Sequence, residues 1–282
     1  MSGPRLRDNL VDGEWLAGRL EDPRVRVIQV DLSPEPYLDG HIPGAVFWDF
    51  LGDLVLPDFR INFDRDVLGR LLGRSGIDGE MTCVCVGGAD PQSRSLGGWL
   101  FWLLKELGHP SVRVLDGGIR KWALEGRPMT AEEADTPEVE YSWAGGVGRS
   151  RVSSEELDRT RGEESSVILD VRTPAEYTGE LYLMAPPKAD ERAGHIPGAV
   201  HIPHELDFAE DGTLRPAGEL RELYESHGVT PDKHVVAYCA AGARSGHTCF
   251  VLSEVLGYPR VANYVGGWNE WSRNPDCPVE RS

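Results

Sequence analysis

The loop Cys239–Ser245 combines a thiol with the features of an anion-binding cradle. It follows an apolar run, Val235–Tyr238, that predicts a strand, and it leads into a predicted helix. Its small residues let successive backbone N–H groups converge on one point, and Gly242 can adopt a conformation that a residue with a Cβ atom resists. The helix N-terminus adds the positive end of its dipole. A cysteine thiolate at the centre of this ring would be stabilised and ready to act as a nucleophile.

The other cysteines lack this setting. Cys83 and Cys85 alternate along the predicted strand Met81–Val86, which favours buried thiols over a metal site. Cys249 lies in the middle of a predicted helix. The fifth, Cys277, makes the number of cysteines odd, and their spacing is irregular, so a disulfide framework is not expected. We therefore predict a cytoplasmic protein that binds no metal.

The charge of the chain excludes some classes of partner. The 282 residues include 46 acidic and 29 basic residues, which gives a formal net charge of −17. This surface repels phosphate backbones and anionic lipid, so we expect neither nucleic acid nor membrane as a partner. Met1–Leu10 has no apolar core and is not predicted to be a signal peptide. The net negative charge of the protein repels an anionic substrate, so a local binding site must attract it.

The elements that would position the cysteine loop occur twice. The heptapeptide Gly-His-Ile-Pro-Gly-Ala-Val is found at residues 40–46 and again at residues 194–200. In each copy an apolar strand that ends in aspartate precedes it, and a strand, a loop, a helix ending in Leu-Gly, a third strand and a glycine pair follow it. Short apolar strands that alternate with helices predict parallel sheets covered by helices. We therefore predict two similar α/β domains, at residues 1–128 and 151–282.

Residues 129–150 are predicted to be the linker, because they are rich in Thr, Glu, Pro and Gly and break the periodicity. Ser153 followed by Glu156 then predicts a capping box at the start of the second domain. In the repeat, Gly87 corresponds to Cys239, and Ser33 lies close to the position of Arg172. The first domain thus lacks the thiol and is expected to be a non-catalytic scaffold.

Together these motifs resemble the two-domain rhodaneses, which are the thiosulfate and 3-mercaptopyruvate sulfurtransferases, and the bacterial thiosulfate enzymes in particular. The likeness lies in the repeated Gly-His-Ile-Pro-Gly-Ala and in the segments Asp170–Tyr177, Cys239–Ser245 and Tyr264–Trp268. It implies a parallel sheet of about five strands flanked by helices in each of two tandem rhodanese-like domains. It also implies a persulfide on Cys239, with sulfur supplied by thiosulfate and accepted by cyanide, a small thiol or a protein thiol. No cofactor is implied.

The donor is a small anion, so the site is expected to hold it with N–H groups and a cation. Arg172 is the first candidate cation because the Asp-x-Arg segment resembles a substrate-contacting region of the family. Arg244 is the second, and it could equally tie the loop to a carboxylate or a carbonyl. The loop residues expected to surround the anionic sulfur are Ala240, Ala241, Gly242, Ala243 and Ser245.

Four other side chains near these motifs are expected to have structural roles. His41 and His195 occupy the same place in the two heptapeptides, and one copy has no nucleophile, so a hydrogen bond that stabilises the turn is favoured over catalysis. His247 is expected on the surface of the helix after the loop. Trp268 is expected in the core.

Three alternatives stay open. Alanine at positions 240 and 241 removes loop charge that would suit thiosulfate, so 3-mercaptopyruvate is the second candidate donor. Phosphatases and arsenate reductases of the Cdc25-like type use Cys-x5-Arg, whereas Cys239 and Arg244 are separated by four residues, and this tighter ring suits one sulfur atom better than phosphate. The third alternative is a binding module without activity.

Overall fold

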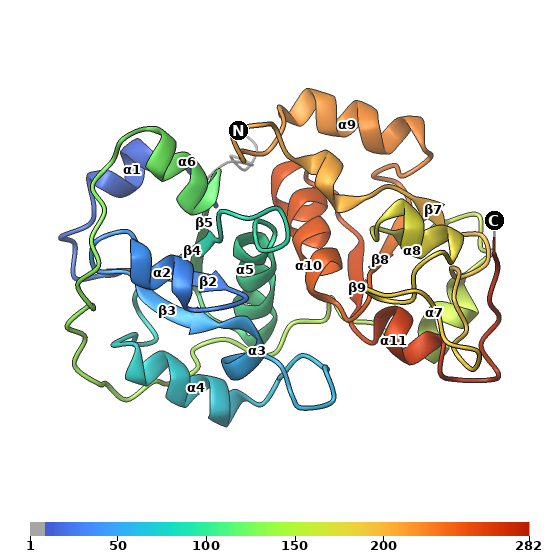
Figure 1. Cartoon of the computed structure of the whole chain (residues 1–282), viewed down its shortest axis with the longest axis horizontal. Coiled ribbons are helices and arrows are strands. Elements are labelled where there is room, and N and C mark those ends of the chain that lie inside the picture. The colour runs from blue at the N-terminus through green and yellow to red at the C-terminus, as the bar shows by residue number, and fades with distance from the viewer. Residues whose placement is uncertain (1–8, 282) are drawn as a thin grey trace. The chain divides into compact units, whose positions relative to one another are not determined.

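The computed structural model describes residues 9–281, which form two compact units, each built on a parallel sheet (Figure 1). Unit 1 contains residues 9–148 and the loop Phe208–Leu214. Unit 2 contains Arg149–Asp207 and residues 215–281. The prediction about a signal peptide at Met1–Leu10 falls mostly outside the described residues. No helix within residues 9–281 is long and apolar enough to cross a membrane.

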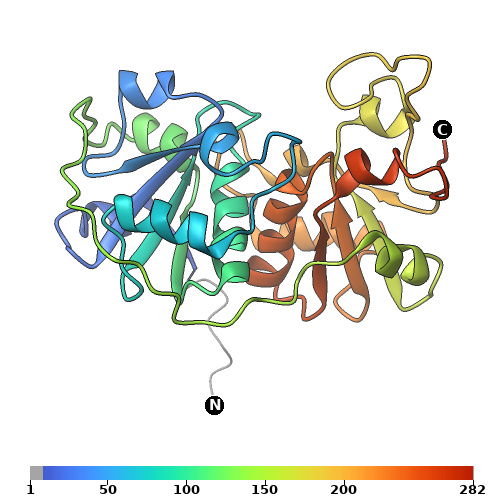
Figure 2. The same ribbon diagram turned by 90° about the horizontal axis from the view of Figure 1, so that it is seen from below.

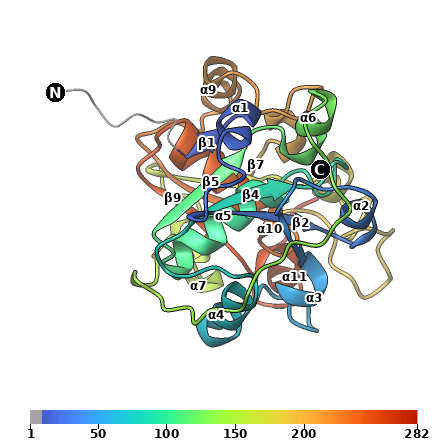
Figure 3. The ribbon, with the colours of Figure 1, turned by 90° about the vertical axis from the view of Figure 1, so that its left-hand side faces the viewer.

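The sheet of unit 1 has five parallel strands, as predicted. In spatial order they are β1 (Leu10–Val11), β5 (Ser111–Leu115), β4 (Thr82–Gly87), β2 (Val25–Asp31) and β3 (Val46–Asp49). Figure 3 shows β5, β4 and β2 side by side. The helices are α1 (Gly13–Ala17), α2 (Glu35–Asp39), α3 (Phe50–Asp53), α4 (Arg65–Arg74), α5 (Leu96–Leu107) and α6 (Gly118–Leu124).

Apolar side chains from the strands and helices form the core of unit 1. Helix α5 packs against β4, β5 and β2 and runs alongside these strands in Figure 2. It ends at Gly108, which has φ 95° and supplies the left-handed C-cap that the Leu-Gly pair predicts. Cys83 and Cys85 on β4 have no exposed surface, which confirms that they are buried strand thiols.

The sheet of unit 2 has four parallel strands, one fewer than unit 1. In spatial order they are β7 (Val200–His201), β6 (Ser166–Asp170), β8 (His234–Tyr238) and β9 (Val261–Tyr264). In place of a fifth strand, Arg151 forms a single parallel bridge with Asn263 of β9. Pairing stops there because Ser153 already caps the next helix.

The helices of unit 2 are mostly short. They are α7 (Ser154–Thr160), α8 (Pro174–Thr178), the 3-10 turn η1 (His204–Asp207), α9 (Ala217–Ser226), α10 (Ala243–Phe250) with the π-helical turn η2 (Val251–Val255), and α11 (Gly267–Trp271). The predicted capping box is confirmed, since Ser153 Oγ accepts from Glu156 N at 3.2 Å and Glu156 Oε2 accepts from Ser153 N at 3.0 Å.

Two segments join unit 1 although they lie outside its repeat. Most of the predicted linker packs on it, with Trp143 Nε1 donating to Arg65 O at 2.9 Å. The loop Phe208–Leu214 comes from the second half of the chain. Its Asp211 pairs with Lys121 at 2.6 Å, and the backbone N–H of its last residue donates to Asp116 at 2.8 Å.

The two heptapeptides build the same turn. His41 stacks on Tyr37 with ring centroids 3.7 Å apart, and His195 stacks on Tyr177 at 3.8 Å. In each pair the histidine Nδ1–H donates to the tyrosine carbonyl, at 2.8 Å and 2.9 Å. His195 follows Tyr177 by 18 residues, whereas His41 follows Tyr37 by 4, so unit 2 carries a long insertion without losing the contact. The geometry agrees with a turn-stabilising role for both histidines.

The cap of α7 can be tested by Ser153→Ala. Loss of the hydroxyl leaves the N–H of Glu156 without its acceptor, so the free energy of unfolding should fall by about 1 kcal/mol. Urea denaturation measures this change. Ser165→Ala, at an exposed serine outside the cap, is the control, and equal losses in the two variants would contradict a specific role of the cap.

Candidate active site

The loop after β8 has the predicted architecture. Strand β8 ends at Tyr238, Cys239 begins the loop, and α10 begins at Ala243. Gly242 is the N-cap of α10 and has φ 87°, in the left-handed region that favours glycine. Cys239 thus lies at the carboxyl end of a parallel strand, where α/β sheets bind their ligands.

Two donors contact the thiol of Cys239. Its Sγ accepts from Gly242 N at 3.2 Å and from Ser245 Oγ at 3.5 Å. Ser245 Oγ also lies 2.7 Å from Asn263 Oδ1, so its single proton can serve either acceptor. Within residues 9–281 the predicted donors Ala240, Ala241 and Ala243 form no hydrogen bond to the sulfur. Cys239 is only 1% exposed, so its sulfur has little contact with solvent.

The start of α11 holds the loop from its other side. Trp268 N donates to Cys239 O at 2.8 Å, and Asn269 N donates to Ala240 O at 3.0 Å. This approach requires Gly267, which has φ 56° and where a Cβ atom would lie 2.5 Å from Cys239 O. The glycine pair before Trp268 is visible in the sequence, but nothing in its spacing indicates a contact with the cysteine.

Arg172 is buried beneath the site and contacts internal groups. Its guanidinium has no exposed surface and is engaged by Asp170, with Nη2–Oδ2 at 2.6 Å and Nε–Oδ1 at 3.0 Å. It also donates to Gly194 O at 2.8 Å and lies 4.7 Å from the centre of the Trp268 ring. Among the described residues its Nη1 has no hydrogen-bond partner, and a contact between Arg172 and the donor stays a prediction. Trp268 has no exposed surface and belongs to the core, as expected.

Arg244 braces the loop. Its guanidinium pairs with both carboxylate oxygens of Glu176, at 2.7 Å and 2.9 Å. Burial alone would raise the pKa of Glu176, but the hydrogen bonds from Arg244 hold it below its usual range. Glu176 also caps α8, with its Oε2 accepting from Thr173 N at 3.0 Å. Of the two roles that the sequence left open for Arg244, the structure shows the tie to a carboxylate.

His247 lies in a buried polar cluster and not on the helix surface, so that expectation is wrong. It is 3% exposed, and its Nε2 lies 3.6 Å from Asp207 Oδ2. Burial, helped by His204, lowers the pKa of His247 to about 3. Burial raises the pKa of Asp207 to about 7, against the effect of a 2.7 Å hydrogen bond from Tyr224 OH. Helix α10 packs on η1. The two elements are far apart in the sequence, so the burial of His247 could not be predicted from its position after the loop.

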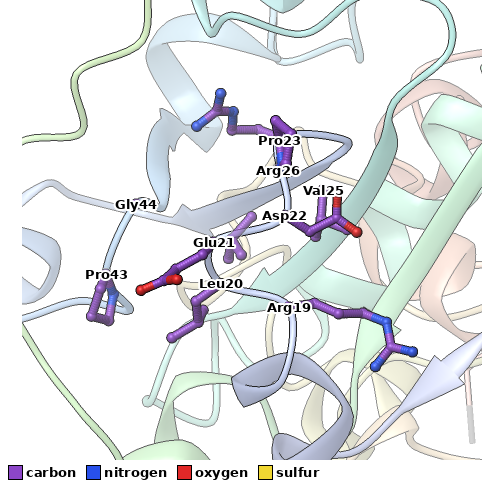
Figure 4. A pocket seen from close by; sticks show the side chains of 10 residues that line it. Arg19, Leu20, Glu21, Asp22, Pro23, Val25, Arg26, Pro43 and Gly44 are labelled. Carbon is purple, nitrogen blue, oxygen red and sulfur yellow. The ribbon is translucent and has the colours of Figure 1, made fainter.

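A separate pocket in unit 1 offers no nucleophile. It is formed by the segment between α1 and β2, the start of β2 and the first heptapeptide turn (Figure 4). Its side chains include no cysteine, and they belong to Arg19, Leu20, Glu21, Asp22, Pro23, Val25, Arg26, Val27, Pro43 and Gly44. In the part of the chain that the structure describes, no three His, Cys, Asp or Glu side chains are arranged to hold a metal ion.

Arg172→Gln tests the structural role of this residue. It leaves the buried carboxylate of Asp170 without its counterion, so the free energy of unfolding should fall by about 3–5 kcal/mol. Urea denaturation measures the loss, and adding Asp170→Asn should restore part of it. Full stability of Arg172→Gln together with a raised KM for the sulfur donor would show that Arg172 contacts substrate after all.

Asp207→Asn tests the buried acid through pH. The pKa of Asp207 in the folded state, about 7, lies above its ordinary value of 3.8, so the folded state binds its proton more tightly. This contribution to stability is fully present below about pH 4 and is lost as the pH rises through 7. Asparagine mimics the protonated acid at every pH. The unfolding free energy of the wild type minus that of Asp207→Asn should therefore fall by a few kcal/mol between pH 4 and about 7. A difference that stays constant with pH would contradict the raised pKa.

Comparison with known proteins identifies both halves of the chain. Residues 12–125 and residues 153–274 each match the family model described as "Rhodanese-like domain". The "Sulfur carrier protein TtuD" of Thermus thermophilus is 39% identical over 278 residues, which cover 96% of this chain and 96% of the relative. The "Putative thiosulfate sulfurtransferase" of Mycolicibacterium smegmatis is 35% identical over 275 residues, covering 97% and 98%.

Solved structures of EanB share the fold. A structure described as a cysteine persulfide of EanB in a tetrahedral intermediate state with ergothioneine has a TM-score of 0.86 and 26% identity, over 100% of this chain and 72% of that one. The anaerobic ergothioneine biosynthesis enzyme from Chlorobium limicola, with trimethyl histidine bound, has a TM-score of 0.83 and 27% identity over the same shares of the two chains.

Proposed function

Because this chain belongs to the rhodanese family of sulfurtransferases, we propose that it moves a sulfane sulfur from thiosulfate to a thiophilic acceptor through a persulfide on Cys239. The observation that carries the proposal is the position of the Cys239 sulfur, which accepts hydrogen bonds from Gly242 N and Ser245 Oγ at the carboxyl end of β8. The relatives named for thiosulfate support this donor, and the persulfide in EanB supports the intermediate.

The reaction proceeds in two displacements. The Cys239 thiolate attacks the outer sulfur of thiosulfate, the S–S bond breaks, and sulfite leaves with the electron pair. Cyanide or a thiolate then attacks the terminal sulfur of the persulfide, so thiocyanate or a new persulfide leaves and the Cys239 thiolate is restored. Gly242 N–H, Ser245 Oγ–H and the N-terminus of α10 stabilise the anionic sulfur in both steps. Because Cys239 is 1% exposed, a donor can reach its sulfur only after the thiol becomes more accessible.

Neither arginine of the site favours phosphate chemistry. Arg172 and Arg244 are both engaged by carboxylates, so neither offers a free fork for the peripheral oxygens of a phosphate. A small donor that needs to present one sulfur atom suits the cradle better. The same cradle can receive 3-mercaptopyruvate, which we retain as the second donor.

Mass spectrometry of the intact protein tests the proposal. After incubation with thiosulfate, the wild type should gain one sulfur atom, and Cys239→Ser should gain none because it lacks the nucleophile. Cys249→Ser, at a buried thiol of α10 that is 2% exposed, is the matched control and should gain the atom as the wild type does.

The other outcomes are also decisive. Sulfur gained from 3-mercaptopyruvate alone would replace the proposed donor. No sulfur gained from either compound would contradict the proposal and favour a module without activity. Turnover of an aryl phosphate that depends on Cys239 would assign the site to phosphatase chemistry.

A further inference from the structure

A buried asparagine on the neighbouring strand holds the loop that carries the thiol. Asn263 lies on β9 opposite Ala237 of β8 and has no exposed surface. Its Nδ2 donates to Gly242 O at 2.9 Å, and its Oδ1 accepts from Ser245 Oγ at 2.7 Å. Both polar groups of the buried amide are therefore satisfied by the loop that begins at Cys239.

The two partners determine the orientation of the amide. Gly242 O can only accept a hydrogen bond, so the NH2 group of Asn263 must face it and the amide oxygen must face Ser245. When the Ser245 hydroxyl donates to that oxygen, it does not donate to Cys239 Sγ. The contact of Asn263 with Ser245 thus competes with the sulfur for a proton, and the contact with Gly242 does not.

The bond to Gly242 O restricts a residue that is otherwise flexible. Gly242 has φ 87°, and glycine adopts several other backbone conformations about as readily. Its carbonyl accepts from Asn263 Nδ2 and also from Gly246 N at 3.1 Å, in the first turn of α10. In the conformation held in this way, the N–H of Gly242 donates to Cys239 Sγ at 3.2 Å.

The first repeat shows that the fold does not require an asparagine at this place. The third residue before the glycine pair that follows the strand is Asn263 in the second repeat and Val114 in the first. Val114 is 7% exposed, and its repeat has glycine at the position of Cys239. A buried amide costs free energy unless it is hydrogen-bonded, whereas valine supplies the packing without that cost. The asparagine therefore occurs in the repeat that has a thiolate to stabilise.

We propose that Asn263 is a positioning residue for Cys239, which holds Gly242 in the left-handed conformation that directs its N–H at the sulfur and thereby favours the thiolate. This inference deepens the proposed function, because both concern the same thiol. Asn263 acts through Gly242 and takes no part in bond making.

The rate at which iodoacetamide alkylates Cys239, followed against pH by peptide mass spectrometry, tests this role. The thiolate is the reacting form, so the midpoint of the pH profile reports its formation, whereas the plateau reports access to the sulfur. Asn263→Leu keeps the volume of the side chain and removes both hydrogen bonds. Its midpoint should lie about one pH unit above that of the wild type, the size expected when one hydrogen bond to a charged group is weakened.

Three further variants separate this role from a loss of stability. Ser245→Ala keeps the bond to Gly242, so adding Asn263→Leu to it should still raise the midpoint by about one pH unit. Asn263→Ala removes the same bonds without an apolar group against the loop and should give the same shift. Asn62→Leu is the matched control, at a buried asparagine of unit 1 that accepts from Asp64 N at 2.9 Å, and should leave the midpoint unchanged.

Circular dichroism shows which variants are folded, and only these are compared. An unchanged midpoint in Asn263→Leu or Asn263→Ala would overturn the inference, and so would a shift that disappears in the Ser245→Ala background. The same shift in Asn62→Leu would assign the effect to lost stability and would overturn it as well. Alkylation needs no sulfur donor, so a wild type that gains no sulfur from thiosulfate overturns the proposed function alone.

Discussion

The buried ion pair between Asp170 and Arg172 is the constraint on which the second half of the chain depends. It lies at the carboxyl end of β6, where Asp170 also accepts a hydrogen bond from Tyr238 OH, at the end of β8. Arg172 reaches the carbonyl of Gly194 in the heptapeptide turn and stacks over Trp268 of α11. Two strands, the turn and a helix therefore meet at one pair of charges. Because two buried charges are costly unless they are paired, these contacts favour one arrangement of the four elements, and the residue after Tyr238 is the cysteine.

The first half of the chain shows what happens to this arrangement without its cation. Asp31 ends β2 as Asp170 ends β6, but the residue two positions later is Ser33 in place of arginine. Burial raises the pKa of Asp31, against the effect of hydrogen bonds from Leu32 N at 2.8 Å and from the side chain of Ser93. The first repeat thus lacks both the thiol and an arginine that could pair with its aspartate. The apolar strands and the stacked histidine turn are retained, since they stabilise the sheet whether or not there is chemistry at its edge.

Most of the features that could be predicted from the sequence depend on local patterns. The strand–loop–helix order around Cys239, the left-handed Gly242 and the capping box of Ser153 each depend on residues only a few positions apart, so they could be inferred directly. The partners of charged groups could not. Glu176 lies 68 residues before Arg244, and Asp207 packs on His247 from another element. Neither spacing leaves a periodic signal, and an arginine beside a reactive thiol has the same sequence whether it faces a ligand or an internal carboxylate.

Because of the loop Phe208–Leu214, the two units do not coincide with the two sequence repeats. Each repeat contains the strands of its own sheet, yet unit 1 draws Asp211 and Phe208 from the second repeat, where they contact Lys121 and Arg94. No single cut in the chain separates the two units, because any break near residue 149 removes part of unit 1 with its neighbour. A gene fission at the linker would therefore yield a first fragment without this loop and without the ion pair of Asp211 with Lys121.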